Sequence, residues 1–115
     1  MDHKDLDVWK KSMDLVVLIY DLTSKFPSDE RFGLTSQMRR AAVSIPSNIA
    51  EGAARKSNKE FLQFLSIALG SLSELETQYI LSKRLHFITD HEGLEHMLID
   101  VKKLVLGFRN YLKKT

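Results

Sequence analysis

The sequence predicts an all-α protein, an antiparallel up-down-up-down four-helix bundle formed by a single domain over residues 1–115. Three observations favour this fold. Apolar residues recur at helical spacing in four long segments. The chain has only 2 prolines and 5 glycines, too few for the many turns of a β-sandwich or barrel. The segments between the predicted helices are short, so consecutive helices should be antiparallel.

The first predicted helix covers residues 6–26. Pro27 should end it, because the residue before a proline avoids helical dihedral angles. The expected apolar stripe follows steps of three and four residues. It consists of Leu6, Trp9, Met13, Val16 and Tyr20, and it is widened by Val17, Leu18, Ile19 and Leu22.

The second predicted helix covers residues 34–55, with Thr35 or Ser36 as its N-cap. Pro46 lies inside it and removes one backbone hydrogen bond, which predicts a kink. Polar side chains at Ser44, Ser47 or Asn48 would then bond the freed carbonyls. The alternative is two shorter helices that meet at Pro46. The expected buried face is Leu34, Met38, Ala42, Ile45, Ile49 and Ala53.

The third and fourth predicted helices cover residues 58–85 and 91–113. Ser57 or Asn58 should cap the third helix, and Thr89 or Asp90 the fourth. The third helix has the apolar face Phe61, Phe64, Leu65, Ala68, Leu72, Leu75 and Tyr79. The fourth has the stripe Leu94, Met97, Leu98, Val101, Leu104, Val105, Phe108, Tyr111 and Leu112.

The third helix carries more apolar surface than one buried face requires. Leu62, Leu69 and Ile80 extend its face on one side, and Ile67 and Leu81 on the other. Small residues in mid-helix would let another backbone approach closely, namely Ala68, Gly70, Ser71 and Ser73. Surplus apolar surface predicts a homo-oligomer that uses this helix. The alternative is a wide core contact within one chain.

Catalytic and metal-binding patterns are missing from the sequence. There is no cysteine, which excludes disulfides and thiol chemistry and fits a reducing cytoplasm. No phosphate-binding glycine loop or nucleophile elbow occurs. His91 and Glu95, like Glu92 and His96, are four residues apart, but they do not form a known metal motif and read as a solvated helix start. We therefore expect no enzyme activity, no cofactor and no metal.

No apolar run is long enough to cross a membrane, and the charged N-terminus is not typical of a signal peptide. We expect a cytoplasmic protein without a membrane partner.

Several polar residues are expected inside the bundle or between subunits. Glu51, Glu74 and Glu76 are the carboxylates predicted to be partly buried, and buried carboxylates need partners. Arg39, Arg40 or Arg55 would supply these ion pairs; a ligand site is the alternative. The structural or interface set is Gln37, Asn48, Glu51, Glu74 and Gln78.

The clearest functional signal is basic charge. The formal net charge is only +2, but residues 36–60 contain five Lys or Arg and two Glu. Arginine binds phosphate with two parallel hydrogen bonds, so these residues are candidates for nucleic-acid binding. The candidates are Arg39, Arg40, Arg55, Lys56 and Lys59, with a second patch at Lys102, Lys103 and Arg109, where Tyr111 is available for stacking. The alternative is a charged surface that only keeps the protein soluble.

Several motifs between residues 26 and 78 resemble one bacterial family. They are Phe26-Pro27, Gly33-Leu34, Arg39-Arg40-Ala41, Ser44-Ile45-Pro46-Ser47-Asn48-Ile49-Ala50-Glu51-Gly52, Glu60-Phe61 and Glu74-Leu75-Glu76-Thr77-Gln78. This pattern resembles the four-helix bundle family encoded by intervening sequences in 23S rRNA genes, sometimes labelled ribosomal protein S23. It is also similar to the accessory variability determinant of diversity-generating retroelements.

The resemblance implies a barrel-shaped homopentamer of four-helix bundles without catalytic residues. The retroelement relative implies binding of nucleic acid and of a reverse transcriptase. We therefore expect a non-enzymatic homo-oligomer that binds RNA or DNA or docks a nucleic-acid enzyme. The alternative is a protein-interaction scaffold without affinity for nucleic acid.

Overall fold

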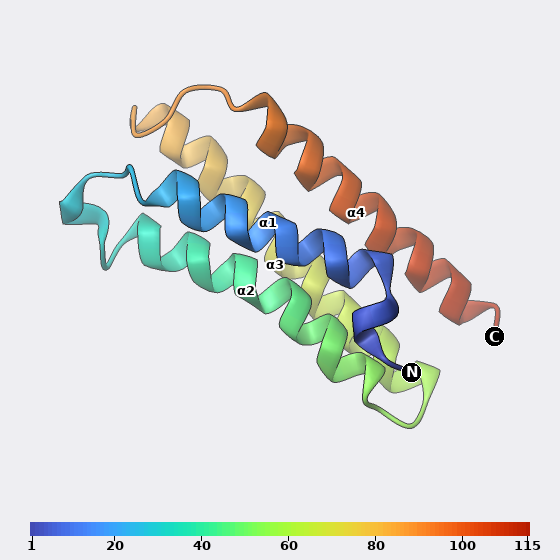
Figure 1. Ribbon diagram of the computed structural model, residues 1–115. Coiled ribbons are helices and arrows are strands. Elements are labelled where there is room, and N and C mark those ends of the chain that lie inside the picture. The colour runs from blue at the N-terminus through green and yellow to red at the C-terminus, as the bar shows by residue number, and fades with distance from the viewer.

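Four antiparallel α-helices make up the computed structural model, which describes residues 1–115 and has no β-strand. The helices are α1 (Asp7–Thr23), α2 (Leu34–Ala53), α3 (Asn58–Arg84) and α4 (Glu92–Lys113), with short 3-10 helices η1 (His3–Asp5) and η2 (Ser28–Glu30). Both termini lie at the same end of the molecule as the turn between α2 and α3 (Figure 1). The predicted all-α fold with four helices is confirmed.

The helices are arranged so that each packs against two others. α1 lies beside α2 and α4, and α3 lies beside α2 and α4, whereas the Cα atoms of the two diagonal pairs stay more than 8 Å apart. The most extensive packing joins α2 and α3. One core runs along the molecule, which measures 45 × 24 × 20 Å. Its fully buried large side chains are Leu15, Ile19, Met38, Ile45, Ile49, Leu65, Leu75, Leu94, Val101 and Val105.

The predicted apolar face of α1 is only partly correct. Ile19 and Leu22 are buried in the core as predicted, and Leu6, Trp9, Val16 and Leu18 pack against it while partly buried. Met13, Val17 and Tyr20 are exposed, and the core also contains Val8 and Leu15, which lie outside the predicted face. The core face of α1 also carries Ser12 and Thr23, which are buried. Each hydroxyl donates back to the helix, Ser12 Oγ to the Trp9 carbonyl at 2.8 Å and Thr23 Oγ1 to the Ile19 carbonyl at 2.7 Å. Because these hydroxyls are satisfied within the helix, their burial costs little.

The predicted buried face of α2 is confirmed at every position. The helix is continuous through Pro46, so the alternative of two shorter helices is wrong. Asn48 Nδ2 donates to the Ser44 carbonyl at 2.7 Å, not to the Ala42 carbonyl that Pro46 frees. The kink at Pro46 stays a prediction. Neither Thr35 nor Ser36 caps the helix, since Gly33 is the N-cap residue.

The ends of α3 and α4 are fixed by side chains and by one strained residue. Ser57 Oγ accepts a hydrogen bond from the Glu60 amide at 3.2 Å, as predicted. The capping prediction for α4 is wrong, because Nδ1 of His91 accepts from the Leu94 amide at 2.9 Å. α3 ends with His86 in the left-handed region at a φ of 63°. None of the four helices is long and apolar enough to cross a membrane.

Candidate nucleic-acid interface

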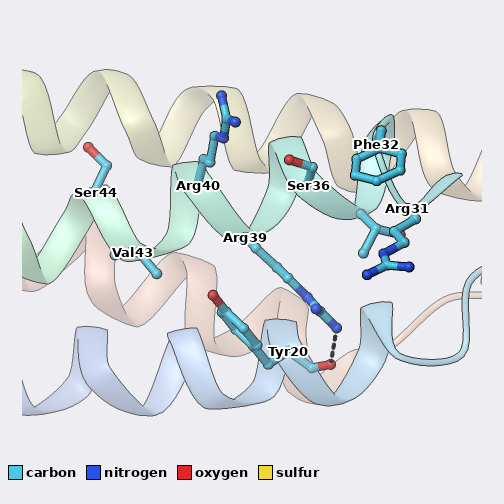
Figure 2. Close-up of a pocket in the computed structure, with 9 residues that line it drawn as sticks. Tyr20, Arg31, Phe32, Ser36, Arg39, Arg40, Val43 and Ser44 are labelled. Carbon is cyan, nitrogen blue, oxygen red and sulfur yellow. Dashed lines mark hydrogen bonds between the residues drawn. The ribbon is translucent and has the colours of Figure 1, made fainter.

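Three arginines line one groove on the outer face of α2. The groove has a volume of about 640 Å³ and extends from the loop before α2 to the middle of that helix. Its lining comprises Tyr20, Arg31, Phe32, Thr35, Ser36, Arg39, Arg40, Val43 and Ser44 (Figure 2). We call it the arginine groove. No carboxylate lines it, so its fixed charge is entirely positive.

Arg39 is the anchored residue of the groove. Its Nε donates to Thr23 Oγ1 at 2.9 Å, and Nη2 donates to the Tyr20 carbonyl at 3.4 Å. The guanidinium carbon lies 4.5 Å from the centroid of the Tyr20 ring. These contacts fix the half-buried guanidinium without neutralising it, because Arg39 has no carboxylate partner. A half-buried arginine that lacks a counter-ion favours an anionic ligand.

Arg31 and Phe32 enter the groove from the loop between η2 and α2. The guanidinium carbon of Arg31 lies 5.4 Å from the centroid of the Phe32 ring. Phe32 itself is 88% exposed, the highest exposure of any large apolar side chain in the protein. Figure 2 shows Arg39 directed toward α1 and Arg40 directed away from it, so the positive groups flank both sides of α2. Ser36 and Ser44 lie on the same helical stripe as Arg40.

The remaining predicted candidates on this part of the chain lie at the other end of the bundle. Arg55, Lys56 and Lys59 surround the turn between α2 and α3, beyond the end of α2 at Ala53, which is about 21 Å from Arg39 at the rise of an α-helix. Arg55 is an ion-pair partner of Glu51 at 3.4 Å and lies over Phe64. The C-terminus of α4 comes to the same end, because Asn58 Nδ2 donates to Thr115 Oγ1 at 2.6 Å. These three candidates therefore form a surface separate from that of Arg39 and Arg40.

The candidates on α4 face different surroundings from one another. Lys102 lines a cleft between α3 and α4 that also contains Glu76. Lys103 lines a groove between α1 and α4 that also contains Asp7, Asp14 and Asp100. Arg109 is half-buried, with its Nε lacking a hydrogen-bond partner. Acidic neighbours offset the two lysines, so this second patch presents less net positive charge than the arginine groove.

The polar residues expected inside the bundle are mostly exposed in this single chain. Glu51, Glu74 and Glu76 are exposed, so the prediction of partly buried carboxylates is wrong for the monomer. Gln37 is also exposed, and Asn48 bonds within α2. Only Gln78 is buried, and its Oε1 has no hydrogen-bond partner. The hydroxyls of Ser44 and Ser71, 2.8 Å apart, provide a polar contact between α2 and α3 instead.

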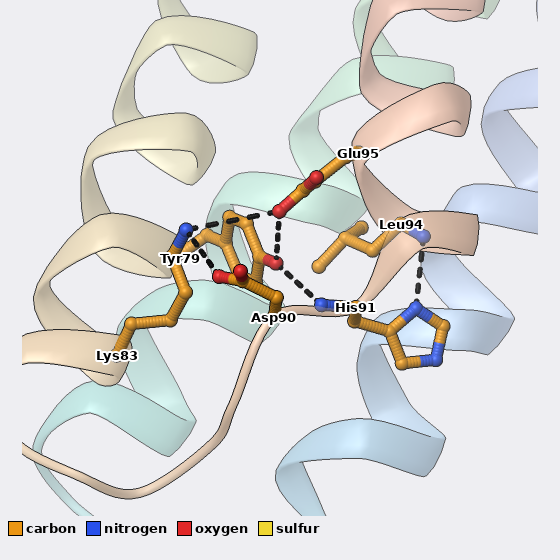
Figure 3. A network of polar contacts seen from close by, with 6 residues as sticks. All are labelled: Tyr79, Lys83, Asp90, His91, Leu94 and Glu95. Carbon is orange, nitrogen blue, oxygen red and sulfur yellow. Dashed lines mark hydrogen bonds and ion pairs between the residues drawn. The ribbon is translucent and has the colours of Figure 1, made fainter.

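A polar network ties α3 to the start of α4 (Figure 3). Tyr79 Oη donates to Glu95 Oε2 at 2.7 Å and accepts from the His91 amide at 2.7 Å. Burial is the main cause that raises the pKa of the Tyr79 phenol above its usual value. Lys83 Nζ pairs with Asp90 at 3.1 Å, and that hydrogen bond raises the pKa of Lys83. His91 and Glu95 are thus engaged in structural contacts, and no cluster of three potential metal ligands occurs in the protein.

Sequence reasoning missed three residues of the arginine groove: Tyr20, Arg31 and Phe32. Tyr20 belongs to the predicted core stripe of the first helix, and the two loop residues follow no helical period. The adjacent pair of a cation and an aromatic ring just before a helix was the available signal.

Comparisons with known proteins indicate one family. The family model described as 23S rRNA-intervening sequence protein matches residues 4–107. A crystal structure at 1.70 Å resolution is similar in fold, that of a protein of unknown function from the S23 ribosomal protein family of Bacteroides thetaiotaomicron VPI-5482. The two chains share 28% sequence identity at a TM-score of 0.81, over 89% of this chain and 97% of that one. No curated protein matches this chain.

Proposed function

The chain belongs to the 23S rRNA-intervening sequence protein family, and on that premise we propose that it is a non-enzymatic, homo-oligomeric protein that binds RNA or DNA through the arginine groove. The similar crystal structure is of a protein of unknown function. The proposal therefore rests on the surface of this chain. The family description mentions 23S rRNA, which makes RNA the first ligand to test.

The observation that carries the proposal is the charge of the arginine groove. Arg31, Arg39 and Arg40 line it, and none of them is paired with a carboxylate. Guanidinium groups bind phosphate oxygens with paired, charge-assisted hydrogen bonds. Aromatic rings beside arginines are typical of surfaces that bind single-stranded nucleic acid. The other basic surfaces are supported less well, because acids lie beside Arg55, Lys102 and Lys103.

Exposed apolar side chains support the homo-oligomer. A second groove of about 370 Å³, between α1 and α2, is lined by Trp9, Met13, Val16, Val43, Pro46, Ser47 and Ala50. On α3, Ile67, Ile80 and Leu81 are exposed. Two different apolar faces favour head-to-tail contacts, which form a ring when the rotation between successive subunits closes. The family resemblance makes a pentamer the expected ring, and repeated arginine grooves would strengthen binding by multivalency.

The proposal assigns the protein a binding role rather than a catalytic one. The two groups with shifted pKa values, Tyr79 and Lys83, belong to the network that joins α3 to α4. Neither lines the arginine groove. Docking of a nucleic-acid enzyme onto the assembly stays a prediction.

Fluorescence anisotropy with labelled RNA and duplex DNA tests the binding role. We expect micromolar or tighter binding that weakens steeply as salt rises. The double variant Arg31→Gln/Arg40→Gln should weaken it at least tenfold. The matched control, Arg55→Gln/Lys56→Gln, removes two charges from the other end and should change it less than threefold.

Two results would contradict the proposal. Absence of binding at low salt would leave the alternative of a protein-interaction scaffold. A larger loss of affinity in Arg55→Gln/Lys56→Gln than in Arg31→Gln/Arg40→Gln would show that nucleic acid binds at the turn between α2 and α3 instead. Sedimentation equilibrium tests the oligomer separately: a multiple of the 13.2 kDa chain mass is expected, and a monomer at micromolar concentration would exclude the ring.

A further inference from the structure

We propose that the arginine groove takes an unpaired nucleotide of a single strand, with its base stacked on Phe32 and its phosphate held between Arg31 and Arg39. This inference rests on the proposed binding of nucleic acid and goes beyond it. It names the form of nucleic acid that the groove accepts and the side chain that selects it.

The phenyl ring of Phe32 lies in water rather than in the core. It is 88% exposed, and the chain places it just after η2, where it contributes nothing to the core. Its neighbour Arg31 lies 5.4 Å from the ring centroid, so a cation accompanies the aromatic surface. An exposed ring beside a cation is suited to a nucleobase, whose stacking on an aromatic side chain is worth about 1–3 kcal/mol.

Two arginines of the groove are placed to hold the phosphate. Arg31 and Arg39 line the same groove, Arg31 from the loop and Arg39 from α2 (Figure 2). Arg39 is held by Thr23 and by the face of Tyr20. Because this side chain is already fixed, little conformational entropy is lost when it binds a phosphate. A phosphate would also supply the negative charge that the half-buried guanidinium lacks.

A paired strand cannot stack a base on Phe32. Bases in a duplex are stacked on one another, and a ring on the protein surface cannot reach their faces. Stacking on Phe32 therefore requires a base that has left the helix, as in single strands and loops. A volume of about 640 Å³ is within the range of clefts that bind small ligands, about 300–1,000 Å³, so one or two nucleotides would occupy it.

The stacking side chain is tested with Phe32→Ala and Phe32→Trp, titrated with a labelled oligouridylate and with a blunt-ended RNA stem made of two fully paired strands. We expect wild type to bind the single strand at least fivefold more tightly than the stem. Phe32→Ala should weaken binding to the single strand by about fivefold or more, with little effect on the stem. Phe32→Trp should keep the affinity, and stacking should quench its emission beyond the change seen for Trp9 in wild type.

Tyr111→Ala is the matched control, because Tyr111 is another exposed aromatic, on α4 at the other end of the bundle. It should bind the single strand like wild type. If Phe32→Ala binds both RNAs like wild type while Arg31→Gln/Arg40→Gln weakens both, the inference is overturned and the proposed function stands. Sensitivity at Tyr111 instead of Phe32 would also overturn it. If the protein binds neither the single strand nor the paired stem, both the inference and the proposed function are overturned.

Discussion

The guanidinium of Arg39 lies over the ring of Tyr20, with 4.5 Å between its central carbon and the ring centroid. This contact joins α2 to α1 on the outer face of the bundle, and the Nε bond to Thr23 reinforces it. Arg39 therefore has two tasks in our account: it fastens two helices and it presents positive charge in the arginine groove.

Substitution of Arg39 by lysine should separate the two tasks. Arg39→Lys keeps the charge but loses the Nε hydrogen bond and the planar contact with Tyr20. We expect the free energy of unfolding to fall by about 1–2 kcal/mol in a urea titration. Arg40→Lys is the matched control, because Arg40 is exposed and without a hydrogen-bond partner; its unfolding midpoint should be unchanged. Equal stability of the two variants would show that Arg39 does not fasten the helices.

Substitution by alanine should lower the stability of the protein at Gly52 and raise it at Gly70. A Cβ at Gly52 would lie 2.5 Å from Cδ1 of Phe61, whose ring is buried, so Gly52→Ala should cost about 1–3 kcal/mol. A Cβ at Gly70 meets nothing within 4 Å, and Gly70→Ala should add about 0.5–1 kcal/mol to the stability of α3. Chemical denaturation of the two variants checks the prediction. If Gly52→Ala is as stable as wild type, the close packing of α2 on Phe61 is contradicted.

Replacement of His86 by glycine should stabilise the protein. Its φ of 63° is a conformation that a residue with a Cβ adopts only at a cost. The amide of Phe87 bonds the Ser82 carbonyl at 2.9 Å and the amide of His86 bonds the Lys83 carbonyl at 3.0 Å, which is the usual glycine-ended helix terminus. We expect His86→Gly to raise stability by about 1 kcal/mol and His86→Ala to leave it nearly unchanged. A melting temperature that falls in His86→Gly would refute the prediction.

Alkaline pH should destabilise the junction of α3 and α4. Burial raises the pKa of Tyr79, and the hydrogen bond to Asp90 raises the pKa of Lys83. In both cases the folded state keeps its proton to higher pH than the unfolded state. The contribution of Tyr79 and Lys83 to the free energy of unfolding is thus complete below about pH 10, and it is lost as the pH rises through their raised pKa values.

Tyr79→Phe isolates one of these groups. The variant loses the bonds to Glu95 and to the His91 amide, so it should be about 1–2 kcal/mol less stable at neutral pH. Its stability should then decline less steeply than that of wild type between pH 9 and pH 12. Parallel declines of the two proteins in urea titrations would show that Tyr79 does not contribute to the alkaline loss.

The helices that could be predicted in detail are those whose apolar and polar residues are clearly separated. α2 meets this condition, and its predicted face is buried at every position. α1 does not, because Ser12 and Thr23 occupy its core face and satisfy their hydroxyls locally. An apolar stripe counted on α1 therefore selects the partly exposed side, where Met13 and Tyr20 lie.

The candidate site was predictable only where it lies on a helix. Arg39 and Arg40 are adjacent on α2 and stand out as a basic pair. Arg31 and Phe32 come from a loop whose backbone no periodicity describes, and Tyr20 comes from the helix face that was assigned to the core. Arg39 and Arg55 are close in the sequence but far apart in space, because α2 is a continuous helix of 20 residues and Arg55 lies beyond its C-terminal end.

Nuclear magnetic resonance of the ¹⁵N-labelled protein, titrated with an oligouridylate, tests the central claim most directly. The claim is that nucleic acid occupies the arginine groove. We predict shifts in the Arg39 Nε–H signal and in the backbone amides of Phe32, Ser36 and Arg40. Shifts confined to residues 55–59 and 113–115, or no shifts at low salt, would contradict it.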